Sequence, residues 1–122
     1  MSKFRAGQIV VVDWRDGKKL EANKTRPAVV VEDDELFDDS WPAVLLAPLT
    51  DEGPHVIRAL SVPLDPSTEN GCTKRCYVAA HLVTATAVSR VRATPSRVTE
   101  AELRSIREKI AQTIGLDQPM RS

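Results

Sequence analysis

Long apolar runs, cysteines and aromatic residues are all scarce in this 122-residue chain, and each scarcity excludes a class of protein. No apolar run approaches the roughly 20 residues that a helix needs to cross a bilayer, which argues against a membrane protein. The two cysteines make no disulfide framework, and the N-terminus has no signal-peptide pattern, so we expect a cytoplasmic protein with reduced thiols. The two Trp, one Tyr and two Phe residues do not form the basic-aromatic pattern of single-strand binders.

Motifs for metals and cofactors are missing as well. His55 and His81 lie 26 residues apart, and Cys72 and Cys76 form a C-x3-C pair, so neither spacing matches a strong zinc pattern. There is no glycine-rich phosphate loop, dinucleotide fingerprint or nucleophile elbow. A formal net charge of zero argues against a polycation that coats nucleic acid. We therefore expect no metal and no cofactor.

What the chain does contain is a series of short strand-like segments. Segments rich in Val, Ile, Leu and Thr, separated by turn residues, predict strands over residues 8–14, 27–31, 43–49, 56–62 and 76–83, with 84–91 as a continuation. The segment 43–47 is apolar throughout, which predicts a central strand buried on both faces. Short strands without long helices between them indicate an antiparallel sheet or a small barrel.

A different periodicity near the end predicts one helix. Apolar residues recur there at spacings of three and four, at Leu103, Ile106, Ile110 and Ile114. Thr99 and Glu102 have the capping-box spacing that starts a helix, and Gly115 is typical of a helix end. We predict a single domain over residues 1–116 and a tail, 117–122, without a structural signal.

The candidate functional residues lie where predicted strands meet loops. Arg26 precedes an apolar strand, where its planar guanidinium matches the geometry of a phosphate; the alternative is an ordinary solvated cation. Thr50 and Asp51 follow Pro48, which indicates that the preceding strand ends there; the alternative is a turn-capping pair. Arg26 and Thr50, together with a loop, are able to hold one phosphate.

Four segments in this order resemble the MazF/PemK family of toxin endoribonucleases. They are residues 7–13 (Gly-Gln-Ile-Val-Val-Val-Asp), 26–31 (Arg-Pro-Ala-Val-Val-Val), 47–50 (Ala-Pro-Leu-Thr) and the helix with its Gly-Leu ending, 103–116. The Arg-Pro run alone is moderately specific, whereas its combination with the first strand and the Pro-x-Thr strand is considerably stronger. The resemblance implies a compact SH3-like or CcdB-like antiparallel barrel with a terminal helix, working as a homodimer.

The resemblance also implies the toxin of a toxin–antitoxin system, which cleaves single-stranded RNA without a metal and uses the 2′-hydroxyl of the RNA as the nucleophile. In the family, the arginine of Arg-Pro and the threonine of Pro-x-Thr form the core of the active site, and here these are Arg26 and Thr50. Arg26 would stabilise the charge on the scissile phosphate and help to shuttle protons, and Thr50 would orient that phosphate. A cognate antitoxin would cover the dimer groove and the active site.

Three further residues are candidates for catalysis or substrate contact. Asp51 stands where the family commonly has Ser or Thr, and its carboxylate would repel a phosphate unless it faces away or acts as a base. His81 occupies the approximate position of a Gln in a later strand, either as an acid or base or as a structural residue. Glu21 matches a Glu often seen in the first loop. That loop is the expected gate of the site, and its lysines are candidate contacts to RNA phosphates: Lys18, Lys19 and Lys24.

Two other functions stay open. The fold that the resemblance implies is also used by CcdB, a non-enzymatic poison of DNA gyrase, but that mode is associated with a Trp-Gly-Ile ending, and this chain ends Gln-Pro-Met-Arg-Ser. The second is a catalytically decayed barrel that retains antitoxin binding, since Asp51 and the missing Gln depart from the family pattern.

Overall fold

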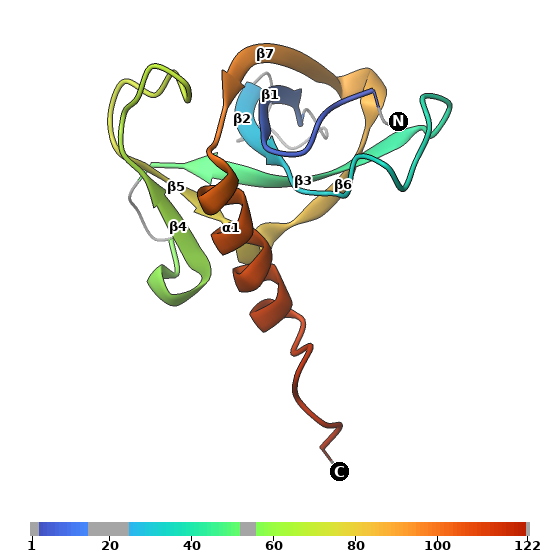
Figure 1. Cartoon of the computed structure of the whole chain (residues 1–122), viewed down its shortest axis with the longest axis vertical. Helices are drawn as coiled ribbons and strands as arrows, with labels where there is room; N and C mark the ends of the chain where they lie inside the picture. The colour runs from blue at the N-terminus through green and yellow to red at the C-terminus, as the bar shows by residue number, and fades with distance from the viewer. Residues whose placement is uncertain (1–2, 15–24, 52–55, 122) are drawn as a thin grey trace.

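A computed structural model of the chain consists of a strongly curved antiparallel sheet with one helix packed beside it (Figure 1). It describes residues 3–14, 25–51 and 56–121. The strands in these ranges are β1 (Gln8–Asp13), β2 (Thr25–Val30), β3 (Ala43–Thr50), β4 (Ser61–Leu64), β5 (Cys76–Ala79), β6 (Thr84–Ala87) and β7 (Val91–Arg97). The helices are three short 3-10 turns, η1 (Arg58–Leu60), η2 (Ala80–Leu82) and η3 (Val88–Arg90), and α1 (Glu100–Thr113). The predicted fold class, a small antiparallel barrel with a terminal helix, is confirmed.

Strand β3 is the centre of the sheet. The strand order is β4-β5-β3-β2-β1-β7, β6 also pairs with β3, and every pair is antiparallel. Residues 46–48 of β3 pair with β2, whereas Leu49 and Thr50 pair with Val78 and Tyr77 of β5. One strand thus belongs to both halves of the sheet and joins them.

Strand β3 and the second half of β2, residues 28–30, are buried on both faces, as the apolar run of β3 predicts. Successive side chains of a strand point to opposite faces, so neighbouring residues enter different hydrophobic clusters. One cluster takes Ala28, Val30, Val44 and Leu46 from these strands. The other takes Val29, Ala47 and Leu49, together with Leu103 and Ile106 of α1. These two central strands therefore separate two cores.

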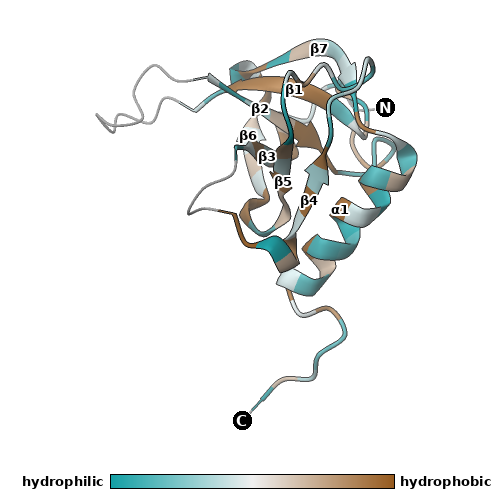
Figure 2. Ribbon diagram, turned by 90° about the vertical axis from the view of Figure 1, so that its left-hand side faces the viewer, coloured by the Kyte–Doolittle hydropathy of each residue, from teal (hydrophilic) through white to brown (hydrophobic). Residues whose placement is uncertain are grey.

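The helix α1 packs against β4, η1 and η2 with its apolar side, and Figure 2 shows hydrophilic residues on its outer side. Leu103 and Ile106 are buried, whereas Ile114, at the C-cap, is 67% exposed and lies beyond the part of the helix that meets the core. Arg107 ties the helix to the end of β2: its Nε donates to the carbonyl of Val31 and its Nη2 to that of Glu32, each at 3.0 Å. The described part of the chain contains no helix long and apolar enough to span a membrane.

The predicted strand over 56–62 is wrong in its first half, and most of β7 was missed. The first half forms η1, and β4 then runs through Pro63 to Leu64. Strand β7 likewise contains Pro95. Both strands lie at the ends of the strand order, so each has one edge without a neighbouring strand. A proline whose nitrogen faces that edge interrupts no ladder hydrogen bond.

The predicted strands over 76–83 and 84–91 are too long, because two 3-10 turns interrupt them. Strand β5 ends at Ala79, and η2 places His81 in a turn, not in a strand. Strand β6 ends at Ala87, and η3 leads into β7. Neither turn contains glycine or proline, so composition alone does not show where the chain changes direction.

The start of α1 gives a first test of the local interactions. The Thr99 hydroxyl accepts from the Glu102 amide at 3.0 Å, and the Glu102 carboxylate accepts from the Thr99 amide at 2.8 Å, so the predicted capping box is confirmed. Thr99→Ala should lower the free energy of unfolding by about 1 kcal/mol, because it leaves a helix-end amide without its partner. Urea denaturation at a fixed protein concentration measures this.

Thr113→Ala is the matched control, since the Thr113 hydroxyl donates only to Lys109 O of the same helix, at 2.8 Å. A surface change of this kind should stay within about 0.5 kcal/mol. Equal losses in the two variants would show that the capping box does not stabilise the fold.

Candidate active site

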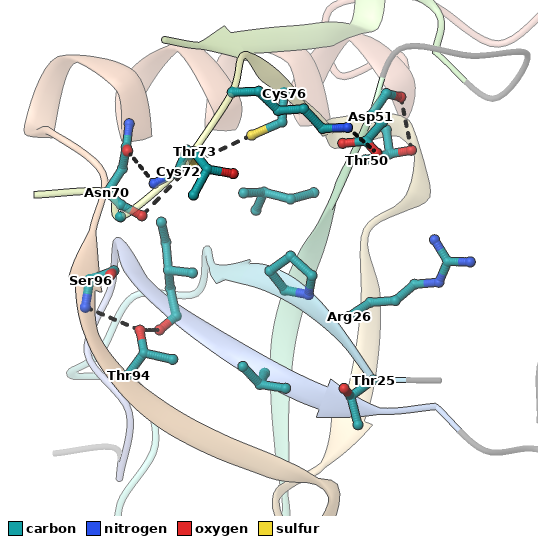
Figure 3. A pocket seen from close by; sticks show the side chains of 16 residues that line it. Thr25, Arg26, Thr50, Asp51, Asn70, Cys72, Thr73, Cys76, Thr94 and Ser96 are labelled. Atoms are coloured by element: carbon teal, nitrogen blue, oxygen red, sulfur yellow. Dashed lines mark hydrogen bonds and ion pairs between the residues drawn. The ribbon is translucent and has the colours of Figure 1, made fainter. Parts of the chain in front are cut away.

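A groove of about 590 Å³ opens beside the ends of β2 and β3 (Figure 3). Apolar side chains from β1, β2 and β3 form part of its lining: Ile9, Val11, Pro27 and Leu49. The polar part of the lining has two groups. Arg26, Thr50 and Asp51 lie on one side in Figure 3, and Asn70 lies on the other, together with Ser96 of β7; the segment that follows Asn70 runs between the two sides.

The groove exists because β2 and β3 separate. Their ladder ends at the pair Ala28 and Pro48, and two more residues in the same register would place Arg26 across from Thr50. The Val31 amide donates to the Leu45 carbonyl, so alternate residues of β2, counted back from Val31, face β3, and Pro27 is the one that has no amide hydrogen to donate there. Thr50 pairs with Tyr77 of β5, which lies along the other edge of β3. Arg26 and Thr50 are therefore left on opposite sides of the opening.

Arg26 is half-buried and lies opposite Val12 of β1 in the register. In Figure 3 its guanidinium reaches toward the side of the groove that holds Thr50 and Asp51. The Thr50 hydroxyl donates to the backbone carbonyl of Asp51 at 3.1 Å. A hydroxyl carries one hydrogen and rotates freely, so Thr50 can turn that hydrogen from the carbonyl to an anion in the groove.

Lys74 bears on the charge of Asp51. The Lys74 ammonium lies 3.2 Å from the Asp51 carboxylate, and both side chains are well exposed. This ion pair reduces the negative charge that an anion would meet next to Thr50, and solvent screens the pair because both side chains are exposed. No local pattern marked Lys74, because its partner lies 23 residues earlier in the chain.

The far side of the groove is built on Asn70, which is 5% exposed. Its Oδ1 accepts from the amides of Ser67 and Cys72 at 3.0 and 2.9 Å, and its Nδ2 donates to the carbonyl of Asp65 at 2.8 Å. Gly71 follows with φ of +67° and passes close to Ser96. The Asn-Gly sequence at positions 70 and 71 is typical of a turn, and nothing in it indicates that the turn lines a groove.

Two thiols belong to the same lining. Cys72 and Cys76 are both free, and their Sγ atoms lie 3.4 Å apart. Burial, followed by the hydrogen bond with Cys72, raises the pKa of the Cys76 thiol to about 12, so Cys76 is a neutral thiol near neutral pH. In the described residues no group of three or more His, Cys, Asp or Glu side chains is arranged to hold a metal ion.

The structure thus brings together three of the residues that the sequence singled out, Arg26, Thr50 and Asp51. His81 is not among the lining residues: it lies in η2, which packs against α1, and its buried Nδ1 has no hydrogen-bond partner in the described part of the chain. The other candidates fall outside the described residues: Lys18, Lys19, Glu21 and Lys24.

Residues 5–114 match the family described as PemK-like, MazF-like toxin of type II toxin-antitoxin system. Among solved structures, an endoribonuclease in complex with its cognate antitoxin from a Mycobacterial species is similar, with 20% identity, a TM-score of 0.73, and 95% of this chain and 99% of that chain covered. The Mycobacterium tuberculosis toxin MazF-mt6 is 18% identical, with a TM-score of 0.67, and the match covers 93% of this chain and 99% of that chain. MazF from Deinococcus radiodurans is 19% identical, with a TM-score of 0.71, and the match covers 92% of this chain and 96% of that chain. A comparison with curated proteins gives no match.

The close approach of Gly71 to β7 predicts a specific sensitivity of this side of the groove. A Cβ at position 71 would lie 2.6 Å from Ser96 Oγ, so Gly71→Ala meets both a steric overlap and the strain of a positive φ. Gly115→Ala is the matched control, because Gly115 has the same φ of +67° and its Cβ would meet only Gln118 Cβ, at 3.8 Å. The positive φ should cost about 1–2 kcal/mol in both variants.

The Ser96 hydroxyl can rotate away from the added Cβ, so the overlap should add only about 0.5 kcal/mol to the loss in Gly71→Ala. Urea denaturation of both variants gives the difference between their free energies of unfolding. A loss in Gly71→Ala that exceeds the loss in Gly115→Ala by more than about 2 kcal/mol would show that Ser96 cannot turn aside.

Proposed function

The chain belongs to the PemK-like, MazF-like toxins of type II toxin–antitoxin systems, and we propose that it is an endoribonuclease that cleaves at the groove between Arg26 and Thr50. The observation that carries the proposal is the position of these two residues on opposite sides of one opening. They are also the residues that match the arginine and threonine of the family motifs. A guanidinium and a hydroxyl facing one opening suit a phosphodiester, which offers both charge and hydrogen-bond acceptors.

In the proposed reaction the RNA supplies its own nucleophile. The 2′-oxygen attacks the adjacent phosphorus, the bond from phosphorus to the 5′-oxygen breaks, and a proton passes from the 2′-hydroxyl to the leaving 5′-oxygen. The products carry a 2′,3′-cyclic phosphate and a 5′-hydroxyl. This chemistry needs no nucleophilic side chain and, in our proposal, no metal.

Arg26 and Thr50 would act on the charge that develops on the phosphate oxygens. The Arg26 guanidinium is a planar cation with several N–H donors, so it would donate hydrogen bonds to the phosphate oxygens. Thr50 would turn its hydroxyl hydrogen from the Asp51 carbonyl to a phosphate oxygen and hold the phosphate in place. Lys74 would reduce the repulsion between Asp51 and the substrate.

Single-stranded RNA fits this groove better than a duplex. Apolar side chains lie beside Arg26 in the lining, among them Val11, Pro27 and Leu49, and they suit the face of a base next to the scissile phosphate. A base reaches such a surface only when it is free of its partner strand.

We further propose a cognate antitoxin as the regulatory partner, a homodimer as the working form, and the cytoplasm as its location. The similar structures support the first of these, since they include a Mycobacterial endoribonuclease with its cognate antitoxin and MazE-MazF from Deinococcus radiodurans. The homodimer and the location follow from the family resemblance.

The test is cleavage of a mixed-sequence single-stranded RNA in the presence of EDTA. Wild-type protein should cut, and Arg26→Ala and Thr50→Ala should each slow cleavage by about 10²- to 10³-fold, because each removes a donor to the phosphate in the transition state. Initial rates from gel electrophoresis measure the effect, and circular dichroism checks that the variants fold.

Two matched variants control for general changes in charge and hydroxyl content. Arg104→Ala removes an exposed arginine on α1, outside the groove, and Thr84→Ala removes an exposed β6 hydroxyl that donates to the next residue's carbonyl as Thr50 does. Both should cut at the wild-type rate. Wild-type protein that binds an antitoxin but cuts none of the RNAs would refute the enzyme proposal and favour a catalytically decayed barrel.

A further inference from the structure

The two cysteines at the groove are positioned to react with each other. Their sulfur atoms are 3.4 Å apart, which is about 1.4 Å more than the roughly 2.05 Å of a disulfide bond. Three residues separate them in the chain, so a small change in the segment 72–76 is enough to close the gap. In Figure 3 the contact between Cys72 and Cys76 lies over the side of the groove opposite Thr94.

Both thiols are held in this position by independent parts of the fold. The Cys72 amide donates to Asn70 Oδ1 at 2.9 Å, which fixes Cys72 at the end of the Asn70 turn. Cys76 is the first residue of β5 and pairs with Leu64 of β4. The short distance between the two sulfurs therefore follows from the Asn70 turn and from the β4–β5 pairing, neither of which depends on the thiols.

The two thiols differ in their access to solvent. Cys72 is half-buried, whereas Cys76 is 8% exposed and has its pKa raised by burial. A thiolate is the attacking species in disulfide exchange, and it must also reach the oxidant. Cys72 is therefore suited to react first, and Cys76 to react second, inside the protein.

We propose that Cys72 and Cys76 form a redox site at the groove, which a small disulfide of the glutathione class oxidises to an intramolecular disulfide. The Cys72 thiolate attacks one sulfur of the oxidant, forming a mixed disulfide and releasing one thiolate. Cys76 then loses its proton and attacks Cys72 Sγ, which forms the Cys72–Cys76 bond and releases the second thiolate. The protein loses two electrons and two protons, and the oxidant becomes two thiols.

Oxidation should change the groove, because the segment between the two cysteines is part of it. Thr73 and Lys74 line the groove, and Lys74 is the ion-pair partner of Asp51, next to Thr50. Closing the disulfide draws this segment together and shifts Lys74 relative to Asp51. We expect slower RNA cleavage in the oxidised form, restored by dithiothreitol; this consequence rests on the proposed function, whereas the disulfide itself does not.

The test treats the full chain with oxidised glutathione, blocks the remaining thiols with iodoacetamide under denaturing conditions, and measures the intact mass. Wild-type protein should lose two hydrogen atoms, retain no glutathione and take up no iodoacetamide. Cys76→Ser should instead keep one glutathione on Cys72. Cys72→Ser should react far more slowly than Cys76→Ser, by at least tenfold, since its remaining thiol is buried.

Peptide mapping of the oxidised wild-type protein gives the same answer without any variant, in case a serine at the buried position 76 prevents folding. A linked peptide that contains both cysteines is the expected product. A lasting glutathione adduct on wild-type Cys72, or two free thiols under conditions that modify Cys76→Ser, would overturn the proposal. RNA that is cut by neither form, while the disulfide is found, would refute the proposed function and leave the redox site standing.

Discussion

The end of the β2–β3 ladder fixes the geometry of the candidate site. Strand β3 lies between β2 and β5: it pairs with β2 along one edge as far as Pro48, and with β5 along the other edge at Leu49 and Thr50. A ladder continued past Pro48 would have brought Arg26 and Thr50 together as direct neighbours and left no groove between them. Pro27 stops the ladder there, because it has no amide hydrogen to donate to β3. The site opens along one edge of β3, while the other edge stays paired with β5 at Thr50.

Burial on both faces fixes the register that this geometry needs. Val29, Val30, Leu46 and Ala47 are all 0% exposed, and adjacent members of each strand enter different cores. A slip by one residue would exchange the two faces of a strand, and burial of each large side chain is worth about 1.5–3 kcal/mol. The positions of Arg26 and Thr50 are therefore set by the apolar residues that follow or precede them, at a distance of one to four residues along each strand.

Local patterns were sufficient for part of this account. The capping box of Thr99 and Glu102 depends on residues three apart, and the doubly buried β3 depends on one continuous apolar run, so both were predictable. The edge strands β4 and β7 were harder to predict from the sequence. Pro63 and Pro95 argue locally against a strand, but a proline is tolerated in a strand at the edge of a sheet. In the site, the motifs identified Arg26 and Thr50. The ion pair of Lys74 with Asp51 joins residues far apart in the chain, which no local pattern encodes. The hydrogen bonds of Asn70 are local, but the position of its turn beside the groove depends on how the loop folds back.

The central claim is that the groove cleaves RNA through the 2′-hydroxyl of the substrate. The most direct measurement maps one cut in a single-stranded RNA oligonucleotide and repeats the reaction on the same oligonucleotide with a single 2′-deoxy residue on the 5′ side of that bond. We expect that the modified bond is not cut, and that the unmodified RNA yields a 2′,3′-cyclic phosphate. Cleavage of the 2′-deoxy bond at the rate of the RNA bond, or a product that ends in a 3′-hydroxyl, would contradict it.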